Sequence, residues 1–333
     1  MGFRRYDLAA LVLLAQLVAC NGTQPASPLP AQPDVFAGNS PPAGEKFLGC
    51  PYPSGDVWTT DVTHAPLSPN SAANIKATVD ARGGGFFTAA ANPTSEYVNQ
   101  ANSSTPLHVV RPLSPDHVPK SPEAWKFSPP FYVEPFSDAH AMVLRTDICH
   151  LYETYGTVAD ARTHTLSAIS GEFVDLTKPF VRPSRGACST ATCIPLALLA
   201  IRPEELRAGV VRHALGWDAV QHSLSLAACV SPAAQTHCTD RLRYDGPPGE
   251  ASYAMPYGAH IRLRASFDNS AFPLEARIVA EALKHYGAYL FDTGCCNTIP
   301  FVNDVNGSPR WTPADDAALK KIQLDSFDVV QPP

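Results

Sequence analysis

Two polar residues stand beside or within apolar segments, in positions suited to general acid or base chemistry. His140 lies two residues after Asp138 and directly before the apolar run 141–144, so a carboxylate could orient its imidazole as a general base. Glu153 follows Tyr152, and a carboxylate beside an aromatic ring can have a raised pKa. The plainer alternatives are a hydrogen-bonded strand histidine and a solvated acid at the end of a strand.

Charged residues in a second segment alternate with apolar ones. Arg262 and Arg264 precede Asp268 in this pattern, which could hold an acidic sugar or a carboxylate. The same arginines could equally form a solvated ladder with neighbouring acids. His213 lies in another apolar segment, 210–215.

Polar groups in apolar surroundings need partners, because an unpartnered one costs about 1–3 kcal/mol. We therefore expect one polar cleft to which separate strands contribute: His140, Glu153 and Asp268 as catalytic residues, and His213 and Arg264 as ligand-binding residues. The alternative is that backbone groups satisfy each side chain separately.

The histidines do not predict a metal site. His140, His213 and His237 lack the short i, i+2 or i, i+4 spacing that would make three histidines a specific metal set. The sequence also lacks the G-x-S-x-G, H-E-x-x-H, Walker and G-x-G-x-x-G patterns. We therefore expect neither a metal nor a cofactor.

The N-terminus has the pattern of an export signal. Arg4 and Arg5 precede an apolar run, 8–19, that is shorter than the roughly 20 residues needed to span a bilayer. The run ends in Leu17-Val18-Ala19-Cys20, which resembles the lipobox of bacterial lipoproteins. The resemblance implies cleavage before Cys20 and lipid on its thiol, and Asn21 at the next position implies the outer membrane if the cell is Gram-negative. The alternative is an ordinary secretory signal that ends beside a chance cysteine.

Cysteine usage agrees with export. Nine cysteines less a lipidated Cys20 leave an even number, as expected in an oxidising compartment. Two pairs would close short loops: Cys188 with Cys193, and Cys229 with Cys238. A zinc site is the rival interpretation, but no paired C-x-x-C spacing supports it.

The remaining four cysteines are harder to pair. Cys295 and Cys296 are adjacent, and a bond between neighbours would strain the backbone. We therefore expect them to bond to Cys50 and Cys149 instead.

Composition divides the chain into three parts. Residues 1–19 are the signal peptide, and residues 20–45 are the lipidated cysteine with a disordered tether rich in proline, alanine and serine. Residues 46–333 are expected to form a single β-rich extracytoplasmic domain. The membrane, reached through lipid on Cys20, is then one partner, whereas a net charge of −6 argues against nucleic acid.

Patterning within the domain favours strands. Thirty-three prolines disfavour long helices and central strands, and many short apolar segments are separated by long turns. The expected strands are 139–144, 149–155, 210–217, 223–230, 260–267 and 289–291. The expected helices are 272–286, one that opens at Thr312-Pro313, and a short one that opens at Pro203 and ends before Gly209; residues 81–106 are expected to be a long loop. The fold class we predict is mainly β, an antiparallel sandwich or barrel-like domain with a few packed helices.

Several segments resemble a group of secreted bacterial proteins. They are Asp138-x-His140, Cys149-x-Leu151-Tyr152-Glu153, Arg212-His213-Ala214-Leu215, Tyr257-Gly258, Arg262 to Asp268 and Ala282-Leu283-Lys284-x-Tyr286-Gly287. The resemblance covers residues 50–330 and implies one continuous extracellular domain. This chain departs from the group at 294–297, where Gly-Cys-Cys-Asn replaces an Asn-Gly-Ser-x-Trp-Tyr stretch.

Two functions follow from these observations. The first is an extracytoplasmic lipoprotein that binds or cleaves a polysaccharide. Paired carboxylates would carry out glycoside hydrolysis, or a histidine and a tyrosine would abstract a proton as in a lyase. The second is a non-catalytic, disulfide-stabilised structural or adhesive module of the cell surface. Convergence of the five candidate side chains would favour the first, and scatter would favour the second.

Overall fold

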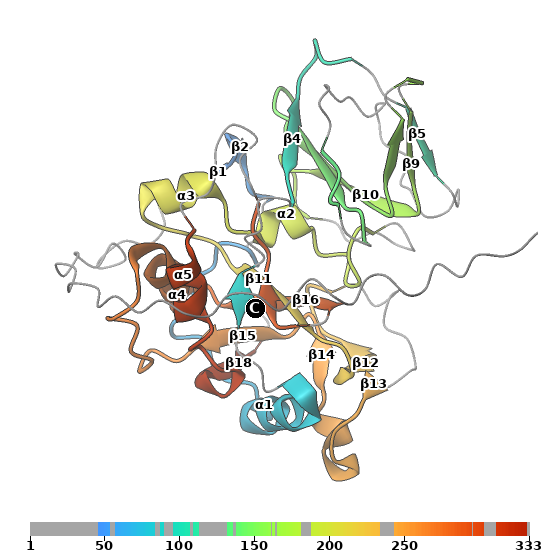
Figure 1. The fold of residues 1–333 in the computed structure, drawn as a ribbon. Coiled ribbons are helices and arrows are strands. Elements are labelled where there is room, and N and C mark those ends of the chain that lie inside the picture. The colour runs from blue at the N-terminus through green and yellow to red at the C-terminus, as the bar shows by residue number, and fades with distance from the viewer. Residues whose placement is uncertain are drawn as a thin grey trace, which may run out of the picture. The chain divides into compact units, whose positions relative to one another are not determined.

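Short strands connected by long turns make up most of the regular structure (Figure 1). The computed structural model describes residues 46–53, 57–83, 87–89, 96–106, 109–112, 132–135, 138–160, 162–163, 165–180, 188–233, 243–294, 296–302 and 311–331. Within these ranges more residues lie in strands than in helices, so the mainly β expectation is confirmed in its coarse form.

The largest sheet has six strands and carries much of the core. In spatial order these are β18 (Phe327–Val330), β15 (His260–Leu263), β16 (Ala288–Gly294), β11 (Leu215–Val220), β17 (Thr298–Ile299) and β3 (Thr88–Ala89). β11 and β16 pair in parallel, and β15 pairs antiparallel with β16 and β18. Trp217, Tyr289 and Leu290 from the two parallel strands are fully buried.

A second sheet has four strands. Their spatial order is β10 (Ser170–Asp175), β7 (His150–Tyr155), β6 (Ala141–Arg145) and β4 (Val98–Ala101). β7 pairs antiparallel with β6 and β10, whereas β4 pairs in parallel with β6. Every residue of β6 is buried, as its unbroken apolar run predicts.

Three smaller sheets complete the described strands. They are β1 (Lys46–Phe47) with β2 (Cys50–Pro51); β13 (Arg243–Tyr244), β12 (Ser223–Cys229) and β14 (Met255–Tyr257); and β5 (Val109–Pro112), β9 (Thr165–Ala168) and β8 (Val158–Asp160).

The predicted antiparallel sandwich or barrel requires correction. Parallel and antiparallel pairs are mixed, and the described strands form no closed barrel. Parallel pairing needs a long connection, and about 70 residues separate β11 from β16. Alternation along a strand reports which face is buried, but it does not report the direction of the neighbouring strand.

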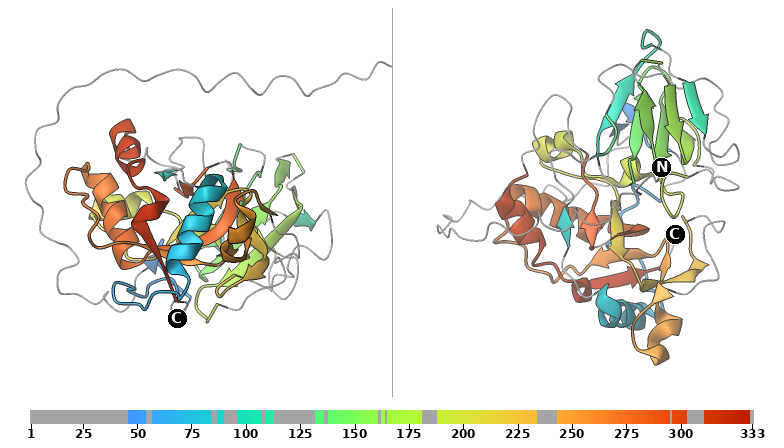
Figure 2. Two further views of the ribbon diagram at one scale, coloured as in Figure 1. Left: turned by 90° about the horizontal axis from the view of Figure 1, so that it is seen from below. Right: turned by 45° about the vertical axis from the view of Figure 1, so that its right-hand side comes forward.

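Five α-helices are described. They are α1 (Ser71–Thr78), α2 (Leu196–Leu199), α3 (Pro203–Ala208), α4 (Leu274–His285) and α5 (Pro313–Leu319), with single turns η1 (Val79–Gly83), η3 (Pro248–Tyr253) and η4 (Leu324–Ser326). Two of the helices, α3 and α5, begin with a capping box. At the start of α5 the Thr312 N–H donates to the Asp315 carboxylate at 2.8 Å, completing a capping box. Figure 2 shows α1, in cyan, beside strand β18, in red.

Two local predictions were wrong. The strand expected over 260–267 ends at Leu263, because Arg264 begins a turn in which the Phe267 N–H donates to the Arg264 carbonyl at 3.0 Å. The loop expected over 81–106 contains strands β3 and β4. Both strands pair with segments distant in the sequence, which local patterning does not report.

The disulfides match one of the predictions and contradict another. The Cys188–Cys193 pair is confirmed, with Cα atoms 4.8 Å apart. Cys50 bonds to Cys149, so the expectation that these two bond to Cys295 and Cys296 was wrong. Cys229 is disulfide-bonded, but Cys238 and Cys295 lie outside the described residues.

The predicted signal, Cys20 and the tether also lie outside the described residues. Among the helices that are described, none has the length and hydropathy to span a bilayer.

Candidate functional site

A pocket of about 700 Å³ lies where strands of both large sheets end. Gln221 follows β11, and residues 292–294 end β16, so one wall is the carboxyl end of two parallel strands. Open sheets commonly bind ligands at such ends. The rest of the lining comes from the ends of the four-stranded sheet and from the loop that joins Cys188 to Cys193: Asp138, His140, Tyr155, Ser170 and residues 188–191.

The segment before β6 presents two functional side chains to this pocket. Ala139 has a φ of +46°, a left-handed conformation that is uncommon for alanine. The turn is held by backbone hydrogen bonds from Gly156 N–H to the Asp138 carbonyl (2.8 Å) and from Thr157 N–H to the Ala139 carbonyl (3.0 Å). Both Asp138 and His140 therefore line the pocket.

His140 is held as an imidazolium. Its Nδ1 lies 2.9 Å from Glu134 Oε2, and its Nε2 lies 3.0 Å from the Ser189 carbonyl oxygen. Both neighbours accept hydrogen bonds, so both ring nitrogens carry hydrogens. Burial lowers the pKa of His140, but the hydrogen bond and charge of Glu134, with the charges of Glu96 and Asp292, raise it to about 10. This geometry favours an electrostatic role over the general-base role that the sequence suggested.

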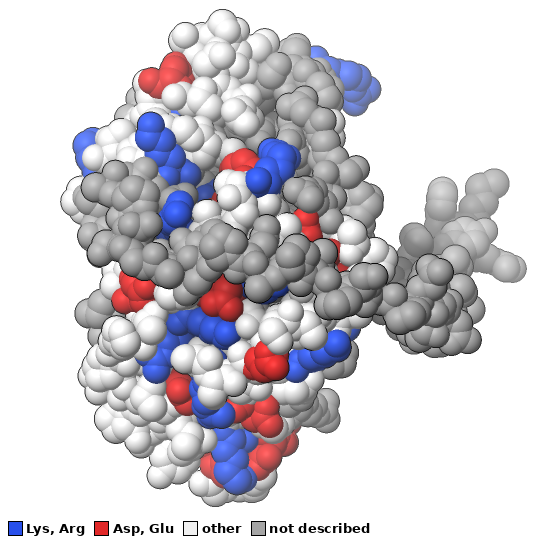
Figure 3. All heavy atoms as spheres, turned by 90° about the vertical axis from the view of Figure 1, so that its left-hand side faces the viewer, with Lys and Arg blue, Asp and Glu red and all other residues white. Residues whose placement is uncertain are grey.

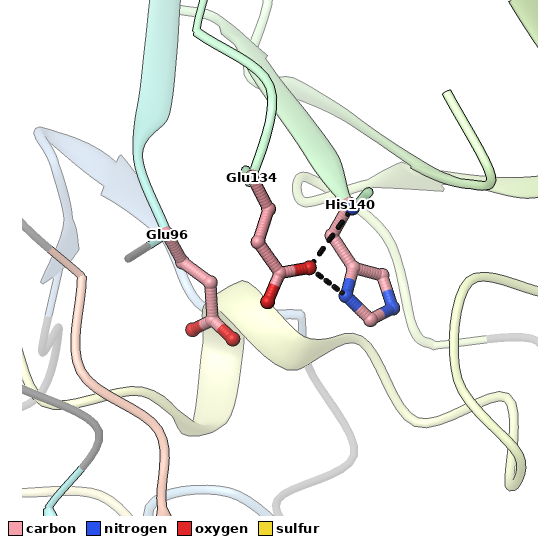
Figure 4. Close-up of side chains that lie close together, drawn as sticks. All are labelled: Glu96, Glu134 and His140. Carbon is pink, nitrogen blue, oxygen red and sulfur yellow. Dashed lines mark hydrogen bonds and ion pairs between the residues drawn. The ribbon is translucent and has the colours of Figure 1, made fainter. Parts of the chain in front are cut away.

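Glu96 and Glu134 form a group of close side chains with His140 (Figure 4). Burial raises the pKa of Glu134, but the side-chain hydrogen bond, the charge and the backbone N–H of His140 together lower it below its ordinary value. Glu96, two residues before β4, is 9% exposed, and burial raises its pKa to about 8. Its Oε2 has no hydrogen-bond partner among the described residues.

Two aspartates meet at the ends of the parallel strands. Asp218 on β11 and Asp292 on β16 are paired across the ladder. Asp292 lines the pocket and accepts hydrogen bonds from Thr293 N–H (2.8 Å) and Ala191 N–H (3.2 Å). Burial nevertheless raises the pKa of Asp292 to about 6. Burial, followed by the charge of Asp292, raises the pKa of Asp218 well above its ordinary value.

Gly294 is needed for this arrangement. A Cβ atom at position 294 would lie 2.6 Å from Asp218 Oδ2. That oxygen also accepts a hydrogen bond from Thr298 Oγ1 at 3.1 Å, which fixes the carboxylate in place. Gly294 thus makes room for a buried acid.

Ser189 joins a second pair of acids beside the pocket. Glu153 on β7 and Glu172 on β10 are directly opposite across antiparallel strands and both almost fully buried. The Ser189 Oγ lies 2.8 Å from Glu153 Oε2 and 2.5 Å from Glu172 Oε1. A hydroxyl has one hydrogen, so it can donate to only one of them, and the other must donate to it.

Glu172 is the protonated member of this pair. Glu153 accepts two further hydrogen bonds from the Leu196 and Ala197 N–H groups, at 2.9 and 2.8 Å, which stabilise its charged form. Burial, followed by the charge of Glu153, raises the pKa of Glu172 to about 8. The pair is therefore a protonated acid that donates to a serine, which donates to a carboxylate.

The structure brings together two of the five residues predicted from the sequence. His140 and Glu153 meet through Ser189, which accepts from the first and donates to the second. Glu153 faces the interior rather than the pocket, so it is a support for the Ser189 loop. His213 lies instead beside Glu205, at 2.9 Å, in a buried group with Arg202. The three-histidine arrangement is not formed between His140 and His213, and His237 lies outside the described residues.

Arg264 and Asp268 are elsewhere. Arg264 is exposed and bonds to Asp328 at 2.9 Å and to the backbone of η4. Asp268 is exposed in a turn, where it accepts from the Ser270 N–H at 2.9 Å. The predicted single cleft is therefore corrected: backbone and local partners satisfy these side chains separately, because the strand that carries them ends at Leu263.

Sequence reasoning missed the acids that do lie in or beside the pocket. Asp292 and Asp218 each stand within an apolar strand, a signal that was available but was not used. Glu172 occupies the same kind of position on β10. Glu96 and Glu134 lie outside regular strands, and no local pattern distinguishes them from solvated acids.

Comparisons with family models, with curated proteins and with solved structures find no match. The chemistry of the pocket therefore rests on its own geometry. None of the described residues that line it is a lysine or arginine, whereas two are aspartates and several carry hydroxyl or amide groups. Such a lining suits a neutral polar ligand better than an anionic one. Acidic and basic side chains are interspersed on the face shown in Figure 3, unlike the basic stripe of a nucleic-acid-binding surface.

Proposed function

We propose that the protein binds and cleaves a neutral polysaccharide in the pocket between the two large sheets. The observation that carries this proposal is that Asp292 and Asp138 face one cavity in different surroundings. Asp292 is partly buried, whereas Asp138 is exposed. Glycoside hydrolysis needs two carboxyl groups in unlike environments, one to give a proton and one to act as base or nucleophile.

Each residue has a distinct role in this proposal. Asp292 donates a proton to the leaving glycosidic oxygen, a task suited to a carboxyl group whose pKa is about 6. Asp138 activates water or attacks the sugar carbon. Tyr155 offers a ring against which a sugar can pack, and the hydroxyl groups of Thr190 and Thr293 offer hydrogen bonds. The sequence-based idea of an acidic sugar held by Arg264 loses its support, because Arg264 is elsewhere.

The test is reducing-end release from a panel of neutral polysaccharides, with binding measured on a glycan array. We expect Asp292→Asn to lower kcat by about 100-fold or more with substrate binding retained, because general acid catalysis contributes roughly 100- to 10,000-fold. Asp138→Asn should have a comparable effect. Asp268→Asn is the matched control, since that aspartate is exposed in a distant turn, and it should match the wild type.

The pH dependence gives an independent check. The acid must carry its proton to react, so kcat should fall as the pH rises above about 6. Binding without cleavage by the wild type would favour the non-catalytic surface module instead. If neither Asp292→Asn nor Asp138→Asn affected cleavage, the assignment of the active site to this pocket would be wrong.

We also propose that the protein is lipid-anchored outside the cytoplasm through Cys20, as the lipobox resemblance implies. Two or three acyl chains give stable anchoring, because each buried methylene contributes about 0.8 kcal/mol. The intact mass of the membrane-extracted protein should exceed that of residues 20–333 by those chains, and Cys20→Ala should abolish the excess. A chain cut at another bond would contradict this proposal.

A further inference from the structure

Glu96 is a buried acid, and the described residues do not supply hydrogen-bond partners for both of its carboxylate oxygens. It is 9% exposed, and its Oε2 has no hydrogen-bond partner among the described residues. A buried polar atom left in this state costs about 1–3 kcal/mol. Buried polar groups are rarely left unsatisfied, and an exception calls for a bound ion, a water or a functional role.

Two potential ligands lie beside this carboxylate. One ligand atom each from Glu96, Glu134 and His140 can be chosen so that all lie within 4.8 Å of one another. Figure 4 shows the carboxylate groups of Glu96 and Glu134 extending from different segments of the chain toward a common region, with the His140 ring on the far side of Glu134. All three residues are partly or fully buried.

The orientation of His140 is set by its other nitrogen. Nε2 donates to the Ser189 carbonyl at 3.0 Å, which directs Nδ1 to the acids. Histidines that bind metals usually donate their second N–H to a carbonyl or carboxylate, and this contact fixes the ring and the tautomer. Nδ1 is therefore the ligand atom that this histidine offers.

We propose that Glu96, Glu134 and His140 bind a divalent transition-metal ion, with Zn²⁺ as its best representative. One imidazole and two carboxylates are a mixed set of the kind that zinc accepts, whereas Ca²⁺ takes six to eight oxygen ligands. Three protein ligands leave a position for water. The ion would replace the proton that now lies between His140 and Glu134, and it would give the unpartnered Glu96 oxygen a partner.

The required movement is small. Zinc bonds of about 2.0–2.2 Å in a tetrahedral site place ligand atoms about 3.4 Å apart. The ligand atoms now lie within 4.8 Å of one another, so Glu96 must approach by at most about 1.4 Å, whereas His140 Nδ1 and Glu134 Oε2, now 2.9 Å apart, must separate by about 0.5 Å. Glu96 can supply its approach through its own rotatable bonds. The site goes beyond the proposed polysaccharide cleavage, because it lies behind His140 and needs no ligand in the pocket.

The test is titration of Zn²⁺ into the full, tag-free chain after removal of metal with a chelator, followed by calorimetry. We expect one bound ion, with affinity at least tenfold weaker in Glu96→Gln, an isosteric change that removes a ligand charge. Glu250→Gln is the matched control, since Glu250 pairs with Lys76 in another part of the fold. Ca²⁺ should bind far more weakly than Zn²⁺.

A second measurement separates this site from other zinc ligands and from misfolding. The zinc X-ray absorption spectrum should show one imidazole and oxygen neighbours, and the metal-free variant should retain the wild-type circular dichroism. Sulfur neighbours, equal affinity in Glu96→Gln, or no binding at millimolar Zn²⁺ would each overturn the proposal. Because the readout is metal binding, a failed glycan assay leaves this result unchanged.

Discussion

Replacing Glu172 by glutamine should make the protein more stable at alkaline pH. Glu172 is 1% exposed, and burial together with the charge of Glu153 raises its pKa from 4.5 to about 8. Between these two pH values the unfolded chain has lost the proton and the folded chain keeps it. The free energy of unfolding therefore decreases as the pH rises through this range. Glutamine can donate to Ser189 as the protonated acid does, but it has no proton to lose.

The size of the effect follows from the shift. A rise from 4.5 to about 8 corresponds to a maximum of about 5 kcal/mol, at about 1.36 kcal/mol per pKa unit. Glu153 bonds to the same Ser189 hydroxyl as Glu172. Part of the pH-dependent free energy therefore belongs to the pair and is still present after Glu172 is replaced. We expect Glu172→Gln to stabilise the fold by about 2–4 kcal/mol near pH 8, and by less than about 1 kcal/mol near pH 5.

Urea unfolding without reductant, at several pH values, measures this difference directly. Glu250→Gln, in the exposed pair with Lys76, is the control and should give a difference that does not vary between those pH values. A Glu172→Gln difference independent of pH would refute the assignment of the proton to Glu172. A variant that becomes less stable relative to the wild type as the pH rises would refute the sign of the argument.

Three further substitutions test other parts of the structure, each by urea unfolding. Replacing both Cys188 and Cys193 by serine should lower the free energy of unfolding by about 2 kcal/mol, the chain-entropy value for so short a loop. An unchanged urea midpoint would show that the disulfide does not restrain the unfolded chain. Gly294→Ala should cost about 1–3 kcal/mol, because the new Cβ would lie 2.6 Å from a carboxylate oxygen; a neutral result would mean that this carboxylate moves freely. Glu205→Ala should cost about 3–5 kcal/mol by removing the buried carboxylate that pairs with the buried guanidinium of Arg202. Glu204→Ala, whose partner is the same guanidinium but which is 40% exposed, should cost about 1 kcal/mol or less, and equal losses would contradict the distinction.

Elements with local signals were predictable from the sequence. Thr312 followed by proline and two acids marks the start of α5, and the apolar face of 272–286 marks α4. The strand that contains Glu153 was expected within one residue of its observed bounds, Cys149–Tyr155 against His150–Tyr155. In each case the residues that define the element are neighbours in the chain.

The site was harder to predict from the sequence, because its geometry depends on pairing between distant segments. Glu172 lies opposite Glu153 only because β10 and β7 pair, and Asp218 lies opposite Asp292 only because β11 and β16 run parallel. The Arg264 segment alternates like a strand, yet it leaves the sheet one residue after Leu263. The position of a polar side chain within an apolar segment shows that it needs a partner. Which residue becomes that partner depends on how the strands pair.

The loop between Cys188 and Cys193 makes the two large sheets dependent on each other for their stability. Ser189 bonds to acids of the four-stranded sheet, while Ala191 N–H and Thr192 Oγ1 bond to Asp292 and the Phe291 carbonyl of the six-stranded sheet. One short covalent ring thus contacts both sheets within a few residues. Neither sheet can open at this edge without exposing buried acids of the other, so local unfolding there is cooperative. Over evolution, residues on the two sheets should therefore be constrained jointly, although they share no strand.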